Sequence, residues 1–118
     1  MAAALGKEGN DLISSDVIRG YNDTILLCLL LDAPSYGYEL SRAIRERTND
    51  AYIIKETTLY SAFERLERNG YIVSYFGEET FGKRRTYYRI TPEGRAYYEE
   101  KCKEWETTKE VINKFVKG

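Results

Sequence analysis

The hydrophobic pattern along the chain is clearest in residues 55–70, KETTLYSAFERLERNG. Leu59, Phe63 and Leu66 recur at spacings of four and three, which places them on one face of a helix. Polar side chains occupy the opposite face, and the closing Asn-Gly pair can end the helix because both residue types tolerate left-handed backbone. The run therefore predicts an amphipathic helix with one buried stripe and a polar outer face.

Two tyrosine-rich runs follow, residues 71–76 and 85–91, and between them lies GEETFGKR, which contains two glycines and a basic end. This spacing predicts a β-hairpin with a long loop. A helix with a polar outer face followed by a hairpin with a basic tip is the layout of a winged helix-turn-helix. The expected fold class is therefore mainly α with a small β-hairpin (α+β).

Upstream of this region, residues 16–32 predict a first helix with a break near Gly20. Its stretch 25–31 is apolar on all sides, which indicates burial all round. A small domain supplies little material for such burial, so we expect a second subunit to cover this stretch together with the chain's own core.

Residues 36–47 predict the second helix, with Ser35 as its capping residue and Glu39 in its first turn. Residues 51–54 follow as a short extended segment. In a winged fold, we expect this segment to pair with the hairpin as its third strand.

After the hairpin, residues 92–117 predict a last helix, with Thr91 as its N-cap and Pro92 at the first helical position. Its apolar residues, Trp105 among them, follow steps of three and four along a narrow seam. So long a helix overhangs a small domain, and we expect its seam to pack on the first helix of a second subunit. The expected division of the chain is a flexible tail (1–15), a winged helix-turn-helix domain (16–91) and a dimerisation helix (92–118).

Composition narrows the classes of function. The 118 residues carry a net charge of −1, yet residues 81–95 hold five lysines and arginines against a single glutamate, so positive charge gathers at the hairpin. The absence of histidine, of a glycine-rich phosphate loop and of clustered metal ligands argues against an enzyme, a metal site or another cofactor. With no membrane-length apolar run and no signal peptide, we expect a cytoplasmic protein whose Cys28 and Cys102 are reduced.

Three runs together carry a resemblance to a known family: GYEL at 37–40, TLYSAFERLERNGYI at 58–72 and RRTYYRITPEGR at 84–95. Over residues 18–116 the chain resembles the PadR-family transcriptional regulators. Its short single C-terminal helix, with tryptophan near the middle, is similar to the compact LmrR-like, multidrug-sensing branch. That resemblance implies a homodimeric repressor with a flat hydrophobic pocket for planar, drug-like aromatic compounds at the dimer interface.

We expect the polar face of the 55–70 helix to enter the major groove of double-stranded DNA. Hydroxyls near its N-terminus and an arginine further along would contact bases or phosphates, and the cations of the hairpin tip would lie along the DNA backbone. A homodimer places two such helices in successive major grooves, so the operator should be roughly palindromic. The predicted DNA-binding residues are Tyr38, Lys55, Thr57, Thr58, Tyr60, Ser61, Arg65, Lys83, Arg84 and Arg85.

Some of these residues have a structural alternative. Thr58 could serve only the helix N-terminus, Tyr60 could be a partly buried structural residue, and Arg65 could pair with an acid on a solvated face. Glu56 and Glu64 on the same helix are unfavourable near phosphate. The DNA-facing strip should therefore be narrow and limited to the first turns.

By the same resemblance, the pocket for an aromatic ligand would be formed by Thr24, Cys28, Cys102, Trp105, Lys109 and Ile112. Trp105 would stack on a planar ligand, or else it is a core residue of the dimer seam. Lys109 stands where the branch carries an acid suited to cations, and a lysine would favour neutral or anionic aromatics. The alternative function is a winged-helix protein-interaction module that does not read DNA.

Overall fold

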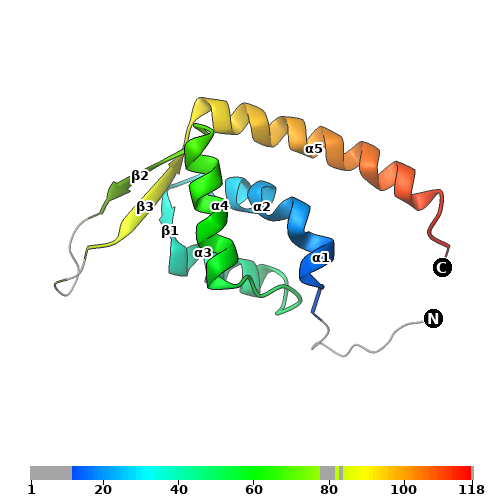
Figure 1. The fold of residues 1–118 in the computed structure, drawn as a ribbon, viewed down its shortest axis with the longest axis horizontal. Helices are drawn as coiled ribbons and strands as arrows, with labels where there is room; N and C mark the ends of the chain where they lie inside the picture. The colour runs from blue at the N-terminus through cyan, green and yellow to red at the C-terminus, as the bar shows by residue number, and fades with distance from the viewer. Residues whose placement is uncertain (1–11, 78–81, 83, 118) are drawn as a thin grey trace.

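A computed structural model describes residues 12–77, 82 and 84–117 of the chain (Figure 1). It is rich in helices and holds one small antiparallel sheet, as the sequence pattern predicts. The elements in chain order are α1 (Ser15–Ile18), the 3₁₀ turn η1 (Arg19–Tyr21), α2 (Asn22–Leu29), β1 (Ser35–Tyr36), α3 (Gly37–Arg47), α4 (Glu56–Arg68), β2 (Ile72–Phe76), β3 (Thr86–Ile90) and α5 (Pro92–Asn113).

The first predicted helix is divided near Gly20, as expected, because η1 separates α1 from α2. Most of the predicted tail, residues 1–11, lies outside the described residues. The chain is already held at Ile13, whose N–H donates to the backbone oxygen of Ala51 at 2.8 Å. The Ser14 hydroxyl then accepts from the N–H of Val17 and caps α1.

The apolar stretch 25–31 is partly buried within this one chain. Leu26, Leu27 and Leu30 are fully buried, and the other four residues are half-buried. Helix α2 lies between α3, α4 and α5, which together supply the surfaces that cover it. The prediction that a second subunit completes this burial stays a prediction.

Helix α4 builds the core with the stripe that its sequence predicts. Leu59, Phe63 and Leu66 are buried, and the ring of Phe63 stacks on Tyr88 of β3 with 3.9 Å between ring centroids. The helix ends at Arg68, and Gly70 then adopts a φ of 81°, a left-handed conformation in which glycine carries no steric cost. The chain can therefore turn directly from α4 into β2.

The prediction for the third strand is wrong. The sheet has the order β1-β3-β2, and its third strand is Ser35–Tyr36, whose residues pair with Tyr88 and Tyr87. Residues 51–54 form neither helix nor strand and have no sheet partner among the described residues. The reason is that α3 carries the chain away from the hairpin before residue 51, whereas the segment just before α3 runs beside β3 (Figure 1).

The capping prediction for the second helix is also wrong. Ser35 lies in β1, and the N-cap of α3 is Tyr36, whose side chain makes no capping hydrogen bond. The Ser35 hydroxyl instead donates to the carboxylate of Glu39. Sheet pairing by residues 35–36 delays the helix start to Gly37, which moves the serine out of capping position.

Helix α5 begins as predicted. The Thr91 hydroxyl accepts from the N–H of Gly94 at 2.9 Å and donates to the backbone oxygen of Gly70 at 2.7 Å. From there α5 runs along α2, at the top of Figure 1. It ends at Asn113 rather than at residue 117, because the last residues lack a packing surface in this chain, and Phe115 is 76 % exposed.

We expect Gly94→Ala to destabilise the fold, because a Cβ at this position would clash with the backbone oxygen of Tyr71. Backbone cannot move aside as a flexible side chain does, so the free energy of unfolding should fall by about 1–3 kcal/mol, measured by urea denaturation. Gly20→Ala is the matched control, because nothing lies within 4 Å of its Cβ. A Gly94→Ala protein as stable as the control would contradict the close approach of α5 to Tyr71.

Candidate nucleic-acid interface and apolar groove

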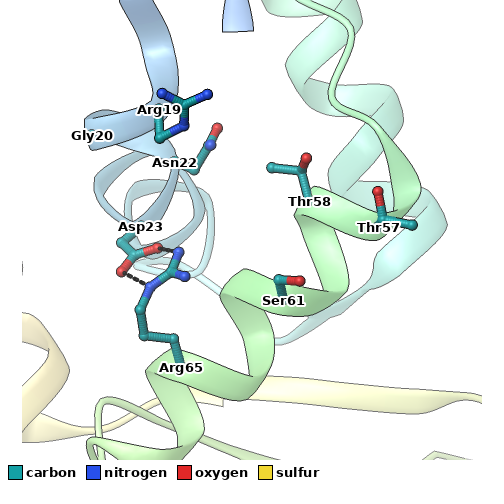
Figure 2. Close-up of a pocket in the computed structure, with 8 residues that line it drawn as sticks. All are labelled: Arg19, Gly20, Asn22, Asp23, Thr57, Thr58, Ser61 and Arg65. Atoms are coloured by element: carbon teal, nitrogen blue, oxygen red, sulfur yellow. Dashed lines mark hydrogen bonds and ion pairs between the residues drawn. The ribbon is translucent and has the colours of Figure 1, made fainter. Parts of the chain in front are cut away.

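The outer face of α4 forms one wall of an open polar cleft of about 400 Å³ (Figure 2). Thr57, Ser61 and Arg65 are spaced four residues apart and therefore lie in a row along one side of the helix. Thr58 joins them in the lining of the cleft. The opposite wall comes from η1 and the start of α2 and consists of Arg19, Gly20, Asn22 and Asp23.

Arg65 is held across this cleft by Asp23. Its Nε donates to Asp23 Oδ2 at 2.9 Å and its Nη2 donates to Asp23 Oδ1 at 2.5 Å, so both carboxylate oxygens accept. The pKa of Arg65 is raised, first by the hydrogen bond to Asp23 and also by that group's negative charge, while partial burial opposes the shift. Arg65 thus pairs with an acid, and the acid comes from another helix rather than from α4.

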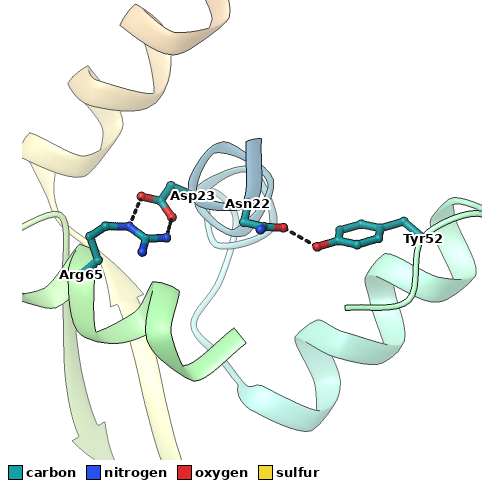
Figure 3. A network of polar contacts seen from close by, with 4 residues as sticks. All are labelled: Asn22, Asp23, Tyr52 and Arg65. Atoms are coloured by element: carbon teal, nitrogen blue, oxygen red, sulfur yellow. Dashed lines mark hydrogen bonds and ion pairs between the residues drawn. The ribbon is translucent and has the colours of Figure 1, made fainter. Parts of the chain in front are cut away.

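Asn22, the neighbour of Asp23, is anchored on the other side of α2 (Figure 3). The buried hydroxyl of Tyr52 donates to Asn22 Oδ1. Burial raises the pKa of Tyr52, and the hydrogen bond to Asn22 partly offsets that rise. The start of α2 is therefore tied to the segment before α4 through Asn22 and to α4 itself through Asp23.

The remaining predicted residues of α4 differ in exposure. Lys55 is the N-cap and makes no capping hydrogen bond with its side chain, and it is exposed at the start of the helix. Tyr60 is exposed over about half of its surface, yet its ring also meets Phe63 edge-on and its hydroxyl lies against the backbone of Gly37. Tyr60 therefore has a packing role whether or not it contacts DNA.

The hairpin of β2 and β3 is the wing of this fold. Two cations at its base, Arg84 and Arg85, are exposed. The guanidinium of Arg85 lies 4.4 Å from the ring centroid of Tyr36, and that of Arg84 lies 5.2 Å from the ring centroid of Phe76. Such contacts orient a guanidinium but leave its positive charge available. Lys83, the third predicted cation, lies outside the described residues.

Tyr38 projects from the first turn of α3 and is also exposed, with the guanidinium of Arg42 lying 5.8 Å from its ring centroid. Its hydroxyl is therefore accessible from solvent. Tyr38 is the predicted DNA-binding residue that belongs to α3.

A second and larger groove, of about 1000 Å³, runs between the N-terminal helices and α5. Trp105 of α5 meets Tyr21 of η1 edge-on, with 5.5 Å between ring centroids, and remains 44 % exposed. Apolar side chains of α1 and α2, such as Val17 and Ile25, form the opposite wall. Five of the six predicted ligand-binding residues line this groove: Thr24, Cys102, Trp105, Lys109 and Ile112.

Cys28, the sixth predicted residue, is not part of the groove lining. Its thiol lies beside Tyr98, and Tyr98 is the residue that lines the groove at this point. The pKa of the Tyr98 hydroxyl is strongly raised, chiefly by hydrogen bonding to Cys28, then to Cys102, and then by burial. Tyr98 therefore lines the groove where the resemblance places Cys28.

The charges in the groove cancel in pairs. Lys109 lies 3.2 Å from a carboxylate oxygen of Glu106, and Lys101 lies 2.6 Å from one of Glu104. All four residues line the groove. The groove consequently presents an apolar surface edged by two ion pairs rather than an excess of positive charge.

The sequence did not predict Asp23 in the polar cleft, nor Tyr21 and Tyr98 in the apolar groove. Asp23 lies 42 residues from Arg65, and no local spacing relates the two. Tyr21 could have been found from the sequence, because Ile18, Tyr21 and Ile25 are spaced three and four residues apart and so lie on one face of a helix. In the described part of the chain, no three potential metal ligands gather at one place, and no helix is long and apolar enough to cross a membrane.

An exposed polar helix face beside a basic hairpin, on a three-helix core with a three-stranded sheet, defines a winged helix-turn-helix protein. The chain belongs to the PadR-like family of transcriptional regulators, whose sequence model matches residues 26–100. It is accordingly a DNA-binding regulator of transcription and not an enzyme.

Individual relatives match most of the chain, and two of them are transcription regulators. A transcriptional regulator from Clostridium thermocellum is 71 % identical, with a TM-score of 0.83 over 90 % of this chain and all of that chain. A PadR family transcription regulator from Clostridium difficile is 38 % identical, with a TM-score of 0.71 over 81 % of this chain and 98 % of that chain. An uncharacterised protein from Lysinibacillus sphaericus is 48 % identical over 91 % of this chain and 98 % of its own length.

We expect Arg84→Ala and Arg85→Ala to weaken binding to all DNA sequences alike, because phosphate contacts carry no sequence information. The probes are a duplex selected by the wild-type protein from a randomised pool and a duplex of random sequence, titrated by fluorescence anisotropy. The slope of log affinity against log salt should become shallower by about 0.9 for each phosphate that the variant no longer neutralises.

The control for the wing variants is Lys103→Ala, which removes an exposed cation from α5. Its binding constants and salt slope should match those of wild type. Unchanged slopes for both wing variants would show that the hairpin does not lie on the DNA backbone.

Proposed function

We propose that the protein is a dimeric, sequence-specific repressor of transcription whose DNA binding is modulated by a small planar aromatic ligand. One observation carries this proposal: η1 and the start of α2 border both the polar cleft at α4 and the apolar groove at α5, and Gly20 lines both. An occupant of the groove would therefore touch the segment that also faces the DNA-reading helix.

For DNA binding, the first turns of α4 would supply the base-reading surface. Thr57 and Ser61 offer hydroxyls on the outer face, and the N–H groups of the first turn are not capped by the Lys55 side chain. Tyr38 and the wing cations would contact phosphates on either side of the major groove. These roles extend the family's DNA binding to particular residues of this chain.

For dimerisation, the end of α5 supplies an exposed apolar surface. Ile112 is 51 % exposed, and Val111, Phe115 and Val116 are similarly open. On the N-terminal side, Leu12 and Val17 are also exposed. A second copy of the chain would cover these side chains and would place two α4 helices on one duplex, with half-sites about 34 Å apart.

For ligand binding, the groove favours a neutral planar aromatic compound. Trp105 and Tyr21 come from opposite walls, and Trp105 remains 44 % exposed, so part of its ring is available to a ligand. Because Lys109 and Lys101 each face a glutamate, neither cations nor anions would find an unbalanced partner.

The second candidate function is a protein-interaction module that does not read DNA. Its support is the pairing of Arg65 with Asp23, which lowers the positive charge that α4 could offer to phosphate. Selection from a randomised duplex pool separates the two functions. An enriched and roughly palindromic sequence supports the repressor, and the absence of any enrichment supports the interaction module.

We expect Ile112→Asp to shift the protein from dimer to monomer, because an interface cannot bury an unpaired carboxylate without a large desolvation cost. The measurement is light scattering coupled to size-exclusion chromatography, over a range of concentrations. Thr107→Asp, at an exposed position of α5 outside the groove lining, is the control and should stay dimeric. A monomeric wild-type protein would contradict the dimer directly.

We expect neutral planar aromatic compounds to quench the emission of Trp105, the single tryptophan of the chain. Saturable quenching should be strongest for neutral members of a panel that also holds cationic and anionic compounds of similar size. The binding compounds should then lower the affinity for the selected duplex. Lys109→Gln unbalances the groove toward Glu106 and should raise the relative affinity of cationic compounds.

A panel without any saturable quenching would favour a purely structural Trp105. Quenching that leaves duplex affinity unchanged would support a ligand site and contradict its regulatory role. The two results are therefore distinguishable.

A further inference from the structure

The contact between Asp23 and Arg65 is unusual among the ion pairs of the described residues. The other pairs join residues three or four positions apart along one local segment, whereas this pair joins α2 to α4. Both carboxylate oxygens of Asp23 accept from the guanidinium fork, at 2.9 Å and 2.5 Å. A two-point contact of this kind sets the plane of the guanidinium as well as its position.

Burial makes the contact more than a surface pair. The side chain of Asp23 is 19 % exposed and that of Arg65 is 43 % exposed. Exposed pairs are screened by water and contribute little to geometry, but a mostly buried carboxylate cannot turn freely to follow its partner. Asp23 also lies in the first turn of α2, where the helix dipole favours a negative charge.

The contact with Asp23 leaves some hydrogen-bond donors of the Arg65 guanidinium free. Nε and Nη2 donate to Asp23, whereas Nη1 has no hydrogen-bond partner among the described residues. Arg65 shares the lining of the cleft with Thr57 and Ser61, so the free donors belong to the outer face of α4 (Figure 2). An acceptor on a base edge could still receive them, while the adjacent carboxylate repels a phosphate.

From this arrangement we infer that Asp23 is a positioning residue for DNA recognition: it holds Arg65 on the outer face of α4 and keeps that arginine from acting as a free phosphate-binding cation. Without Asp23, Arg65 would become a mobile positive charge that attracts any duplex. With Asp23 in place, the contribution of Arg65 to DNA affinity depends on whether the bound sequence offers a hydrogen-bond acceptor within its reach. The inference rests on the proposed reading of DNA by the outer face of α4.

The test compares Asp23→Asn with Asp16→Asn. Both substitutions remove one carboxylate that pairs with an arginine of the cleft, but Asp16 pairs with Arg19 on the wall opposite α4 rather than with a residue of α4 itself. Each variant is titrated by fluorescence anisotropy against the selected duplex and the random duplex, over a range of salt concentrations. Thermal unfolding confirms that both variants remain folded.

Asp23→Asn should raise the affinity for the random duplex and steepen its salt slope by about 0.9 for each arginine released. The ratio of selected to random affinity should fall on the order of tenfold, which corresponds to the removal of one well-placed hydrogen-bonded pair with a base. Asp16→Asn frees Arg19 on the opposite wall of the cleft, so it can steepen the salt slope as well, but it should leave the ratio of selected to random affinity unchanged. A merely structural role for Asp23 would lower both affinities together and would not steepen the slope.

A second variant, Arg65→Gln, keeps the inference falsifiable. In the Arg65→Gln background, adding Asp23→Asn should have no more effect than adding Asp16→Asn, because there is no guanidinium left to release. The inference is overturned if Asp23→Asn and Asp16→Asn have the same effect on the affinity ratio in the wild-type background. It is also overturned if Asp23→Asn keeps its full effect in the Arg65→Gln background. If the wild type enriches no sequence, the proposed sequence-specific function fails, while the salt slopes on random duplex still decide whether Asp23 restrains Arg65.

Discussion

Burial of the short helix α2 is the constraint on which both candidate sites depend. Leu26 and Leu27 are fully buried between α3, α4 and α5, so the orientation of α2 about its own axis is determined by the core. Neighbouring residues on a helix point about 100° apart. Asp23 therefore faces α4 while Thr24 faces the groove along α5. The packing of one apolar helix thus sets how the two cavities lie relative to each other.

Helix α4 has to satisfy two requirements with opposite faces. Its inner face stacks Phe63 on Tyr88 and closes the core, which fixes the helix rigidly in the domain. Its outer face, which we propose reads DNA, is polar, and there the long side chain of Arg65 pairs with Asp23 rather than packing on the core. A restrained cation attracts DNA in general less strongly, and its contribution depends more on the particular sequence that is bound. The weak net charge of the chain is consistent with such a balance.

Elements with a strong local pattern could be predicted from the sequence, and elements defined by their neighbours could not. The stripe of α4, the two strands of the hairpin and the cap of α5 at Thr91 follow from residue spacing and turn chemistry alone. The third strand did not follow, because Ser35–Tyr36 is too short to show a period. Residues 51–54 do alternate, with Tyr52 and Ile54 buried, but alternation cannot say which backbone lies alongside.

The sequence by itself determined the family, the core-facing stripe of α4 and the cluster of cations at the hairpin, because these properties depend on one segment at a time. Only the tertiary structure decided that Asp23 meets Arg65, that Tyr21 meets Trp105, and that Tyr98 replaces Cys28 in the groove wall. Each of these contacts joins two elements. Periodicity tells which face of a helix is apolar, but the rotation and separation of packed helices depend on how all the core side chains fit together.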